Sequence, residues 1–318
     1  MPVSRPPISS LALTCCALLL PACGTGERTP TPAVGSVVNV VARGLTFEAP
    51  DTIPSGWTTF RFDNQAPMVH FVQVERLPEG ITIKEQQELV APVFQEGYRL
   101  LAAGQTDSAM AAFGTLPEWF GQIIFVGGPG LTAGGLVSEA TVHLEPGTYL
   151  LECYVKTGGV FHSFNPAPPA YGMVHQFTVT DSVTEAPEPT TDLQVTLSSA
   201  RGIEVSGVPV AGPQTIAVTF EDQKVHENFV GNDLHLARLG DGADISALAA
   251  WMDWRFPGGL ETPAPVQFLG GIQDMPAGAT GYFKVILSPG EYAWVSEVAN
   301  PDQKGMLKTF GVSEDSPS

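Results

Sequence analysis

Hydrophobic positions in this chain recur mostly in short runs that alternate with polar residues and are separated by Gly, Pro, Asn and Asp. Runs of about four to eight residues rich in Val, Thr, Phe and Tyr between such turn residues are typical of β-strands. In the first half of the chain the pattern predicts strands at residues 37–41, 45–48, 57–62, 70–77, 122–126, 140–144, 149–155 and 173–179. The pattern therefore predicts an all-β protein.

Residues 83–113 depart from this pattern. Segments 84–89 and 98–103 have the composition of helices, so we expect one or two helices in a long crossover between strands. A short helix is also expected at 245–250. The Gly-rich stretch 127–135 lacks the Gly-Lys-Ser/Thr ending of a phosphate-binding loop, and we interpret it as a connection beside a strand.

The order of segments then recurs in the second half of the chain. Residues 144–149 return as 287–292, 171–177 as 304–310, and 60–65 as 218–223. Recurrence in the same order predicts two copies of one structural module. We place them at 36–180 and 193–313, joined by an acidic, Pro- and Thr-rich linker at 181–192 and followed by a tail at 314–318.

The N-terminus has the features of an export signal. Arg5 precedes an apolar run at 11–20 that is too short to span a membrane, so residues 1–22 are interpreted as a secretory signal peptide. The ending Leu-Pro-Ala-Cys resembles the lipobox of bacterial lipoproteins, which implies cleavage before Cys23 and a lipid on its sulfur. Residues 23–35 would then form a flexible tether. We expect an exported protein, lipid-anchored to a bacterial membrane and facing the periplasm or the cell exterior.

Charge narrows the class of partner. The chain has 15 basic and 33 acidic residues, and loss of Arg5 with the signal leaves 14 basic residues and a net charge of −19. Nucleic acid is excluded as a natural partner, because its binding requires a basic face. The acidity suits a soluble body held off a membrane, or docking to a basic redox protein. The sequence specifies no oligomeric state.

Cysteine usage points to one position. Cys15 and Cys16 leave with the signal and Cys23 carries the lipid, so Cys153 is the single free thiol of the exported body and cannot form an internal disulfide. His162 and Met173 follow Cys153 on one strand–loop–strand unit. A thiolate, a thioether and imidazoles form the ligand set that suits copper in a trigonal site with a weak axial Met. His70 is placed to supply the second imidazole.

This order of elements resembles the cupredoxins, the plastocyanin/azurin-like superfamily of Greek-key β-sandwiches. In that family a His follows an early Phe-x-Phe-x-Asn strand, and Cys, His and Met surround the last loop; here residues 60–64 precede His70. The resemblance implies two cupredoxin-like sandwiches, the first with a helical crossover insertion, and copper held by His70, Cys153, His162 and Met173. Strand alternation independently turns His70, Cys153 and Met173 inward.

The spacing departs from the family's short ligand loop. Eight residues separate Cys153 from His162 and ten separate His162 from Met173, and His175 shares the parity of Met173 as a reserve ligand. Two interpretations stay open. One is a copper site; the other is a copper-free sandwich in which Cys153 is a small buried hydrophobe. A different metal or a redox-sensing thiol is a lesser alternative.

The second copy lacks this ligand set. Alignment on the Pro-Gly turns puts Ser296 at the place of Cys153 and Asn232 near that of His70, so the second module is predicted to be metal-free. No His-x-His or His-Cys-His pair is present to build the catalytic copper centres of multicopper oxidases or nitrite reductases, so we do not expect an enzyme. The predicted function is a membrane-anchored copper electron carrier; the alternative is a copper-free binding module displayed on the membrane surface.

Overall fold

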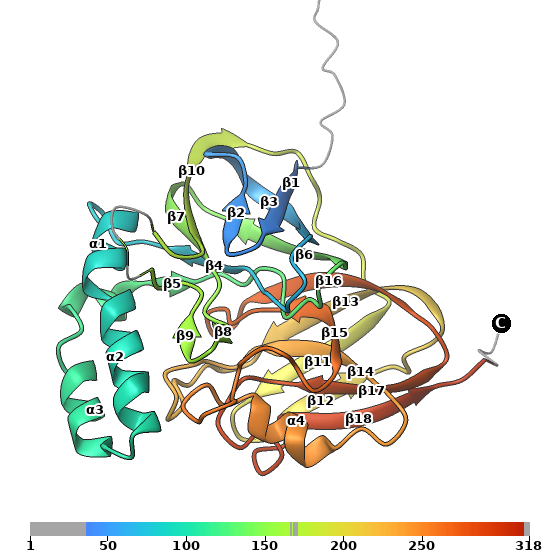
Figure 1. The fold of residues 1–318 in the computed structure, drawn as a ribbon. Helices are drawn as coiled ribbons and strands as arrows, with labels where there is room; N and C mark the ends of the chain where they lie inside the picture. The colour runs from blue at the N-terminus through green and yellow to red at the C-terminus, as the bar shows by residue number, and fades with distance from the viewer. Residues whose placement is uncertain (1–35, 166, 168–170, 315–318) are drawn as a thin grey trace, which may run out of the picture. The chain divides into compact units, whose positions relative to one another are not determined.

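The computed structural model describes residues 36–165, 167 and 171–314 (Figure 1). Most of the regular structure in this part of the chain is β-strand, which confirms the all-β prediction. The predicted signal peptide, Cys23 and the whole of the tether lie outside the described residues. No helix within the described ranges is long and apolar enough to cross a bilayer.

The first half of the described chain forms two sheets that share one long strand. The strands of the first sheet are β1 (Ser36–Arg43), β2 (Thr46–Glu48), β3 (Thr52–Asn64) and β6 (Val137–Leu144). The second sheet contains β10 (Val174–Val183), β7 (Gly147–Glu152), β4 (Gln73–Arg76) and β5 (Ile124–Phe125), in that order. The N-terminal end of β3 pairs with β10, whereas the rest pairs with β1 and β6, so β3 passes from one sheet to the other.

Aromatic side chains fill the space between these two sheets. Alternation along β3 buries Phe60 and Phe62, because successive side chains of a strand point to opposite faces. Phe60 contacts Phe177 of β10 with ring centres 6.2 Å apart, and Tyr149 of β7 stacks on Phe177 at 5.4 Å. The Tyr149 hydroxyl donates a hydrogen bond to the Glu145 carbonyl (2.7 Å), which fixes the turn before β7.

The second half repeats this pairing scheme. Its strands are β11 (Leu193–Ser198), β12 (Gly202–Ser206), β13 (Gly212–Phe220), β14 (Leu234–Leu239), β15 (Gln267–Ile272), β16 (Thr280–Leu287), β17 (Gly290–Val295) and β18 (Leu307–Val312). Strand β13 pairs in parallel with β11 and antiparallel with β16, as β3 does with β1 and β6. The Tyr292 hydroxyl donates to the Ser288 carbonyl (2.7 Å) and its ring stacks on Phe310, which matches Tyr149.

The predicted module boundaries stay predictions, and two features of the structure bear on them. Strand β10 continues to Val183, beyond the predicted edge at residue 180. Strand β6 pairs not only with β3 but also with β16, with Tyr282 opposite Thr141. One hydrogen-bonded path of strands therefore runs through both halves of the described chain.

The crossover contains three α-helices, more than the one or two predicted. They are α1 (Ile83–Leu89), α2 (Ala91–Ala102) and α3 (Thr106–Phe113), followed by the 3-10 helix η1 (Glu118–Gln122). A capping box between Thr82 and Glu85 starts α1, and Gly104 with φ +72° separates α2 from α3. These helices lie together on the side of β4 and β5 (Figure 1). A fourth helix, α4 (Ile245–Trp251), lies where a short helix is predicted.

A single extended segment, residues 127–133, joins the two halves and is called the bridging segment below. On one side it bonds to β4 and the residues before it, through Val74 N to Gly127 O (2.8 Å), Val72 N to Pro129 O (2.9 Å), His70 N to Thr132 O (3.2 Å) and Thr132 N to His70 O (2.7 Å). On the other side it bonds to β15 and its flank, through Gly130 N to Gly271 O (3.2 Å), Gln273 N to Gly128 O (3.0 Å) and Ala133 N to Phe268 O (2.9 Å). The Gly-rich stretch is therefore a shared strand-like partner of both halves.

Glycine is required in the bridging segment because neighbouring backbones approach it so closely. A Cβ at Gly128, where φ is +113°, would lie 2.2 Å from the Val72 carbonyl oxygen. A Cβ at Gly130 would lie 2.7 Å from Nδ1 of His235. A side chain at Gly128 would push the bridging segment away from β4 and its flank, and one at Gly130 would push it away from β14 and β15.

We predict that Gly128→Ala lowers the free energy of unfolding by about 3 kcal/mol or more, because backbone atoms cannot move away from the new methyl group. Gly135→Ala is the matched control, since Gly135 also has a positive φ (+78°) but no atom within 4 Å of the added Cβ. The control should cost only the backbone strain of about 1–2 kcal/mol. Denaturant unfolding of both variants measures the difference, and equal losses would contradict close packing at Gly128.

Candidate metal centre

Three of the predicted ligand residues meet in the interior of the first half. The Nδ1 atom of His70 lies 3.4 Å from Sγ of Cys153 and 3.2 Å from Nδ1 of His162, and the distance from Sγ to Nδ1 of His162 is 3.9 Å. The exposed fractions of His70, Cys153 and His162 are 0%, 0% and 2%. One nitrogen from each imidazole and the thiol sulfur therefore point at a common position shielded from water.

Strand β7 positions the thiol. Cys153 directly follows β7, on the same face as the buried Tyr149 and Leu151. Its backbone N–H donates to the carbonyl of Met173 (3.2 Å), which continues the pairing of β7 with β10. The inward direction predicted for Cys153 from alternation is the one that the structure shows.

The bridging segment positions His70. The backbone N–H and carbonyl of His70 both bond to Thr132, as an isolated antiparallel bridge just before β4. Two hydrogen bonds to one residue fix the direction of the His70 side chain. Placement of this imidazole thus depends on a segment more than sixty positions away in the sequence.

A small hairpin inside the long loop positions His162. Strands β8 (Lys156–Thr157) and β9 (Val160–Phe161) pair, and the His162 N–H donates to the Val155 carbonyl (2.8 Å). Nε2 of His162 lies 2.8 Å from Oγ1 of Thr157. A hydrogen bond from Nε2–H to this hydroxyl leaves Nδ1 as the lone pair that faces Cys153 and His70.

Met173 and His175 have different surroundings. Met173 is fully buried, its N–H donates to the carbonyl of His162 (2.6 Å), and its own carbonyl accepts from Cys153. Its backbone therefore adjoins two of the three converging residues. Nε2 of His175 instead lies 3.4 Å from the Pro50 carbonyl and 3.5 Å from Asp51, so the structure brings His162 rather than His175 to Cys153.

Burial determines the protonation of the three groups. It lowers the pKa of His70 to about 4, and burial together with His70 lowers that of His162 to about 3, so both imidazoles are neutral at pH 7. Burial raises the pKa of the Cys153 thiol to about 12. Two neutral imidazoles and a thiol that ionises only when a cation compensates it are conditions that favour a metal ion.

The distances also fit one small ion. Three ligands at about 2.0–2.3 Å from a central ion in a trigonal arrangement are separated by about 3.5–4 Å, close to the three observed separations. Two imidazoles and a thiolate are the trigonal donors of mononuclear copper sites. Hydrogen bonds among the thiol and the ring nitrogens account for the same distances equally well.

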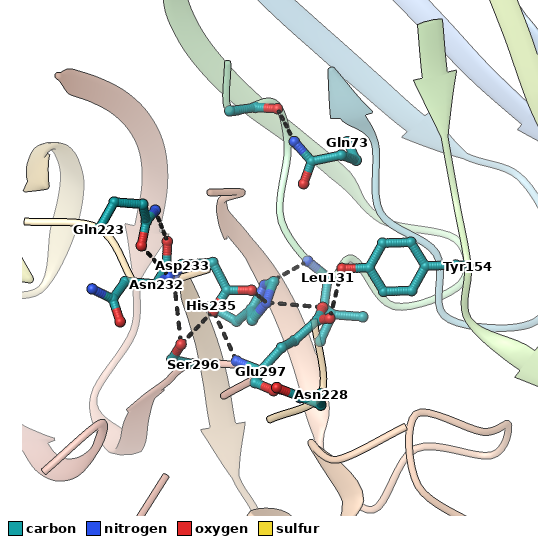
Figure 2. Close-up of polar contacts among 11 residues, drawn as sticks. Gln73, Leu131, Tyr154, Gln223, Asn228, Asn232, Asp233, His235, Ser296 and Glu297 are labelled. Carbon is teal, nitrogen blue, oxygen red and sulfur yellow. Dashed lines mark hydrogen bonds and ion pairs between the residues drawn. The ribbon is translucent and has the colours of Figure 1, made fainter. Parts of the chain in front are cut away.

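A second group of ionisable side chains was not found from the sequence. Nε2 of His235 lies 3.1 Å from Oδ2 of Asp233 and 3.1 Å from Oε1 of Glu297, and all three side chains are fully buried (Figure 2). Asp233 directly precedes β14 and His235 lies in it, and their i, i+2 spacing in the sequence indicates that both side chains point to the same side. Glu297 follows β17, and nothing in the sequence places it beside them.

Hydrogen bonding indicates that this second group is a polar cluster. The backbone N–H of Leu131 donates to Nδ1 of His235 (3.0 Å), so Nδ1 holds a lone pair and Nε2 carries the proton (Figure 2). A metal ion at Nε2 would have to displace that proton and leave an imidazolate. Ser296 corresponds to Cys153, because its backbone N–H donates to the Met306 carbonyl as that of Cys153 donates to the Met173 carbonyl. The Oγ–H of Ser296 donates a hydrogen bond to the Asp233 carboxylate (2.6 Å).

No protein-family model matches the sequence, and no curated protein matches it. Among solved structures the chain is similar to auracyanin A, a "blue" copper protein of Chloroflexus aurantiacus, at 18% identity over 46% of this chain and 100% of that one, with a TM-score of 0.28. It is similar to a dithionite-reduced auracyanin of Roseiflexus castenholzii at 20% identity, over 46% and 98% of the two chains, with a TM-score of 0.24.

The copper nitrite reductase of Nitrosomonas europaea is similar over a longer range, at 12% identity over 89% of this chain and 94% of that one, with a TM-score of 0.22. Scores this low decide nothing about the site. The strand pairing of the described residues confirms the all-β prediction, and the resemblance to the cupredoxins rests on the order of the strands and the converging residues.

A buried lysine holds the hairpin that carries His162. Nζ of Lys156 donates to the Trp254 carbonyl (2.6 Å) and lies 3.6 Å from the centre of the Tyr98 ring. The Lys156 N–H also bonds the Leu260 carbonyl (2.8 Å). Burial lowers the pKa of Lys156 to about 7 from its usual 10.5.

We predict that the folded protein becomes more stable as the pH rises above 7, because Lys156 is buried. Between about pH 7 and pH 10.5 the unfolded chain binds more protons at Lys156 than the folded chain, so stability rises with pH in this window. The melting temperature of the wild type minus that of Lys156→Met should therefore rise by about 3 °C or more from pH 7 to pH 10. Lys284→Met, an exposed control, should show no such trend; parallel curves for all three proteins would refute the assignment.

Proposed function

We propose that this protein is an extracytoplasmic, membrane-anchored carrier of single electrons that binds one copper ion. The observation that carries the proposal is the convergence of Nδ1 of His70, Sγ of Cys153 and Nδ1 of His162 in a buried position. These three residues would hold the ion, and Met173 is the axial ligand that the cupredoxin resemblance implies. Copper in such a site supplies one-electron oxidation and reduction.

The protein's own contribution would be a fixed and dry set of ligands. His70 is held by two backbone bonds to Thr132, Cys153 by the pairing of β7 with β10, and His162 by Thr157. Ligands that cannot move keep the same arrangement in both oxidation states, which favours rapid electron transfer. Burial of all three excludes water from the position where they meet.

Features of the sequence support the proposed location and partners. The lipobox-like ending at Cys23 supports a lipid anchor, and the acidic body supports docking to a basic redox protein. The lack of His-x-His and His-Cys-His pairs supports a carrier rather than an enzyme. The second module would have a structural or interactive role.

A copper-free binding module displayed on the membrane is the second candidate. It is favoured by the hydrogen-bonding distances among His70, Cys153 and His162, called the trio below. It is also favoured by the raised pKa of Cys153, which keeps the thiol protonated when no cation is present. In this case the trio would only stabilise the interior, and binding would use other surfaces of the same fold.

Copper titration distinguishes the two candidates. The exported chain from residue 24 onward, mixed with Cu(II), should bind one equivalent and develop an intense visible band from thiolate-to-copper charge transfer. Cys153→Ser should abolish the band because it removes the thiolate. His175→Ala, which changes an imidazole outside the trio, should keep it. Failure of the wild type to bind stoichiometric copper would reject the carrier.

Thr157→Val tests the orientation of His162. Valine is nearly isosteric but offers no acceptor for Nε2–H, so the imidazole loses its preferred tautomer and direction. We expect copper affinity, measured by competition with a chelator, to fall about 10–100-fold. Thr178→Val, at an exposed position of β10, is the control and should leave affinity unchanged. Wild-type affinity in Thr157→Val would show that this hydroxyl does not position the ligand.

A further inference from the structure

A cavity with a polar floor lies where the helical insertion meets both halves of the fold. Its volume is about 70 Å³, enough for about five water-sized groups. Strands β4 and β7 and the residues after β15 supply polar side chains to it. Helix α1 adds the polar Gln86, and α2, η1 and the segments around residues 229 and 254 supply most of the apolar side chains.

Three carboxylates line the cavity with no cation to balance them. They belong to Glu75, Glu152 and Asp274, and no Lys, Arg or His is among the described residues of the lining. Burial and the other two acids raise the pKa of Glu75 well above its usual value. Gln86 donates to Glu152 (2.5 Å), but no described residue donates a hydrogen bond to the Glu75 carboxylate. The cavity therefore favours a positively charged occupant.

Two amide oxygens in the lining lack partners. Gln73 and Asn228 are 1% and 0% exposed, and Gln73 Oε1 and Asn228 Oδ1 make no hydrogen bond within the described structure. Both amides have a fixed orientation, because their nitrogens donate to backbone carbonyls of Val74 and Glu297 (3.3 and 2.7 Å). Buried acceptors without donors are costly, so the occupant should bring several N–H groups.

The wall of the cavity is aromatic. The ring of Phe94 lies 5.6 Å from that of Phe120, 5.8 Å from that of Phe229 and 6.0 Å from that of Trp254, measured between centres. All four residues line the cavity. Such a wall accommodates an alkyl chain and attracts a cation to the faces of its rings.

A bare metal ion fits less well than an organic cation. Within the described ranges, only the His70 trio and the Asp233 cluster bring the ligand atoms of three or more His, Cys, Asp or Glu residues within 4.8 Å of one another. The three carboxylates of the cavity do not form such a group, so they cannot close together on one ion as they stand.

We propose that this cavity binds a small primary ammonium cation with a short apolar tail. The ammonium group carries three N–H donors, and the Glu75 carboxylate and Gln73 Oε1, which line the cavity from the same face of β4, can accept them. The tail lies along the wall formed by Phe94 and Phe120. This site is separate from the copper proposal and does not depend on it.

Calorimetry on the metal-free exported chain, with n-butylammonium chloride as the probe, tests the proposal. Absence of copper matters because amines are themselves copper ligands. n-Butylammonium should bind one per chain and about tenfold or more tighter than methylammonium or n-butanol, which lack the tail or the charge. Cys153→Ser protein, which should not bind copper, should bind n-butylammonium as well as the wild type does. Failure of one proposal can therefore be distinguished from failure of the other.

Two variants locate the site. Glu75→Gln should weaken n-butylammonium binding about tenfold or more, whereas Glu79→Gln, an exposed acid nearby, should not. Phe120→Ala should reduce the difference in affinity between n-butylammonium and methylammonium. Because burial and the neighbouring acids raise the pKa of Glu75 in the folded state, this carboxyl group lowers the stability of the fold above its ordinary pKa, and Glu75→Gln should melt no lower than the wild type at pH 7.

Three results would overturn the proposal. The first is equal binding of n-butanol and n-butylammonium, which would make the cavity merely apolar. The second is equal affinity in Glu75→Gln and Glu79→Gln. The third is stoichiometric binding of Ca²⁺ that displaces n-butylammonium, which would make the carboxylates a metal site.

Discussion

The close contact of the bridging segment with both halves is the constraint on which the rest of the structure depends. Residues 127–133 form hydrogen bonds with β4 and its flank on one side and with β15 and its flank on the other. Gly128 leaves no room for a side chain against Val72, and Gly130 leaves none against His235. The same segment fixes His70 through Thr132 and contacts His235 through the N–H of Leu131. A local loss of packing here would therefore disturb the candidate metal centre and the polar cluster together.

Much of the first half could be predicted from local sequence pattern, whereas the position of His162 beside Cys153 and His70 could not. Alternation is a property of a few consecutive residues, so it was enough to turn His70 and Cys153 inward. The direction of His162 depends instead on a hairpin that Lys156 ties to the carbonyls of Trp254 and Leu260, about a hundred residues later. No short-range signal encodes such a contact. The count of helices was too low for a simpler reason, since the third helix, α3, begins after the turn at Gly104, beyond the two segments whose composition indicated helices.

The two halves share a pairing scheme but have different chemistry at corresponding positions. The end of β7 carries Cys153 and the end of β17 carries Ser296, each bonded through its N–H to a methionine carbonyl. The sequence indicated this substitution correctly. It did not indicate that Ser296 would donate to Asp233, because the polar cluster draws on the ends of two strands and on the bridging segment of the other half.

Burial of negative charge links the candidate metal centre to the cavity. Glu152 and Cys153 are consecutive, so their side chains leave the end of β7 on opposite faces, one into the cavity and one into the trio. Burial is the main reason that the Cys153 thiol resists ionisation, and Glu297 and Glu152 add to it. On each face a buried anion is therefore stable only beside a cation, and β7 separates two positions with the same electrostatic requirement. Their donors differ, with nitrogen and sulfur on one face and oxygen on the other, and this difference is what would direct different cations to each.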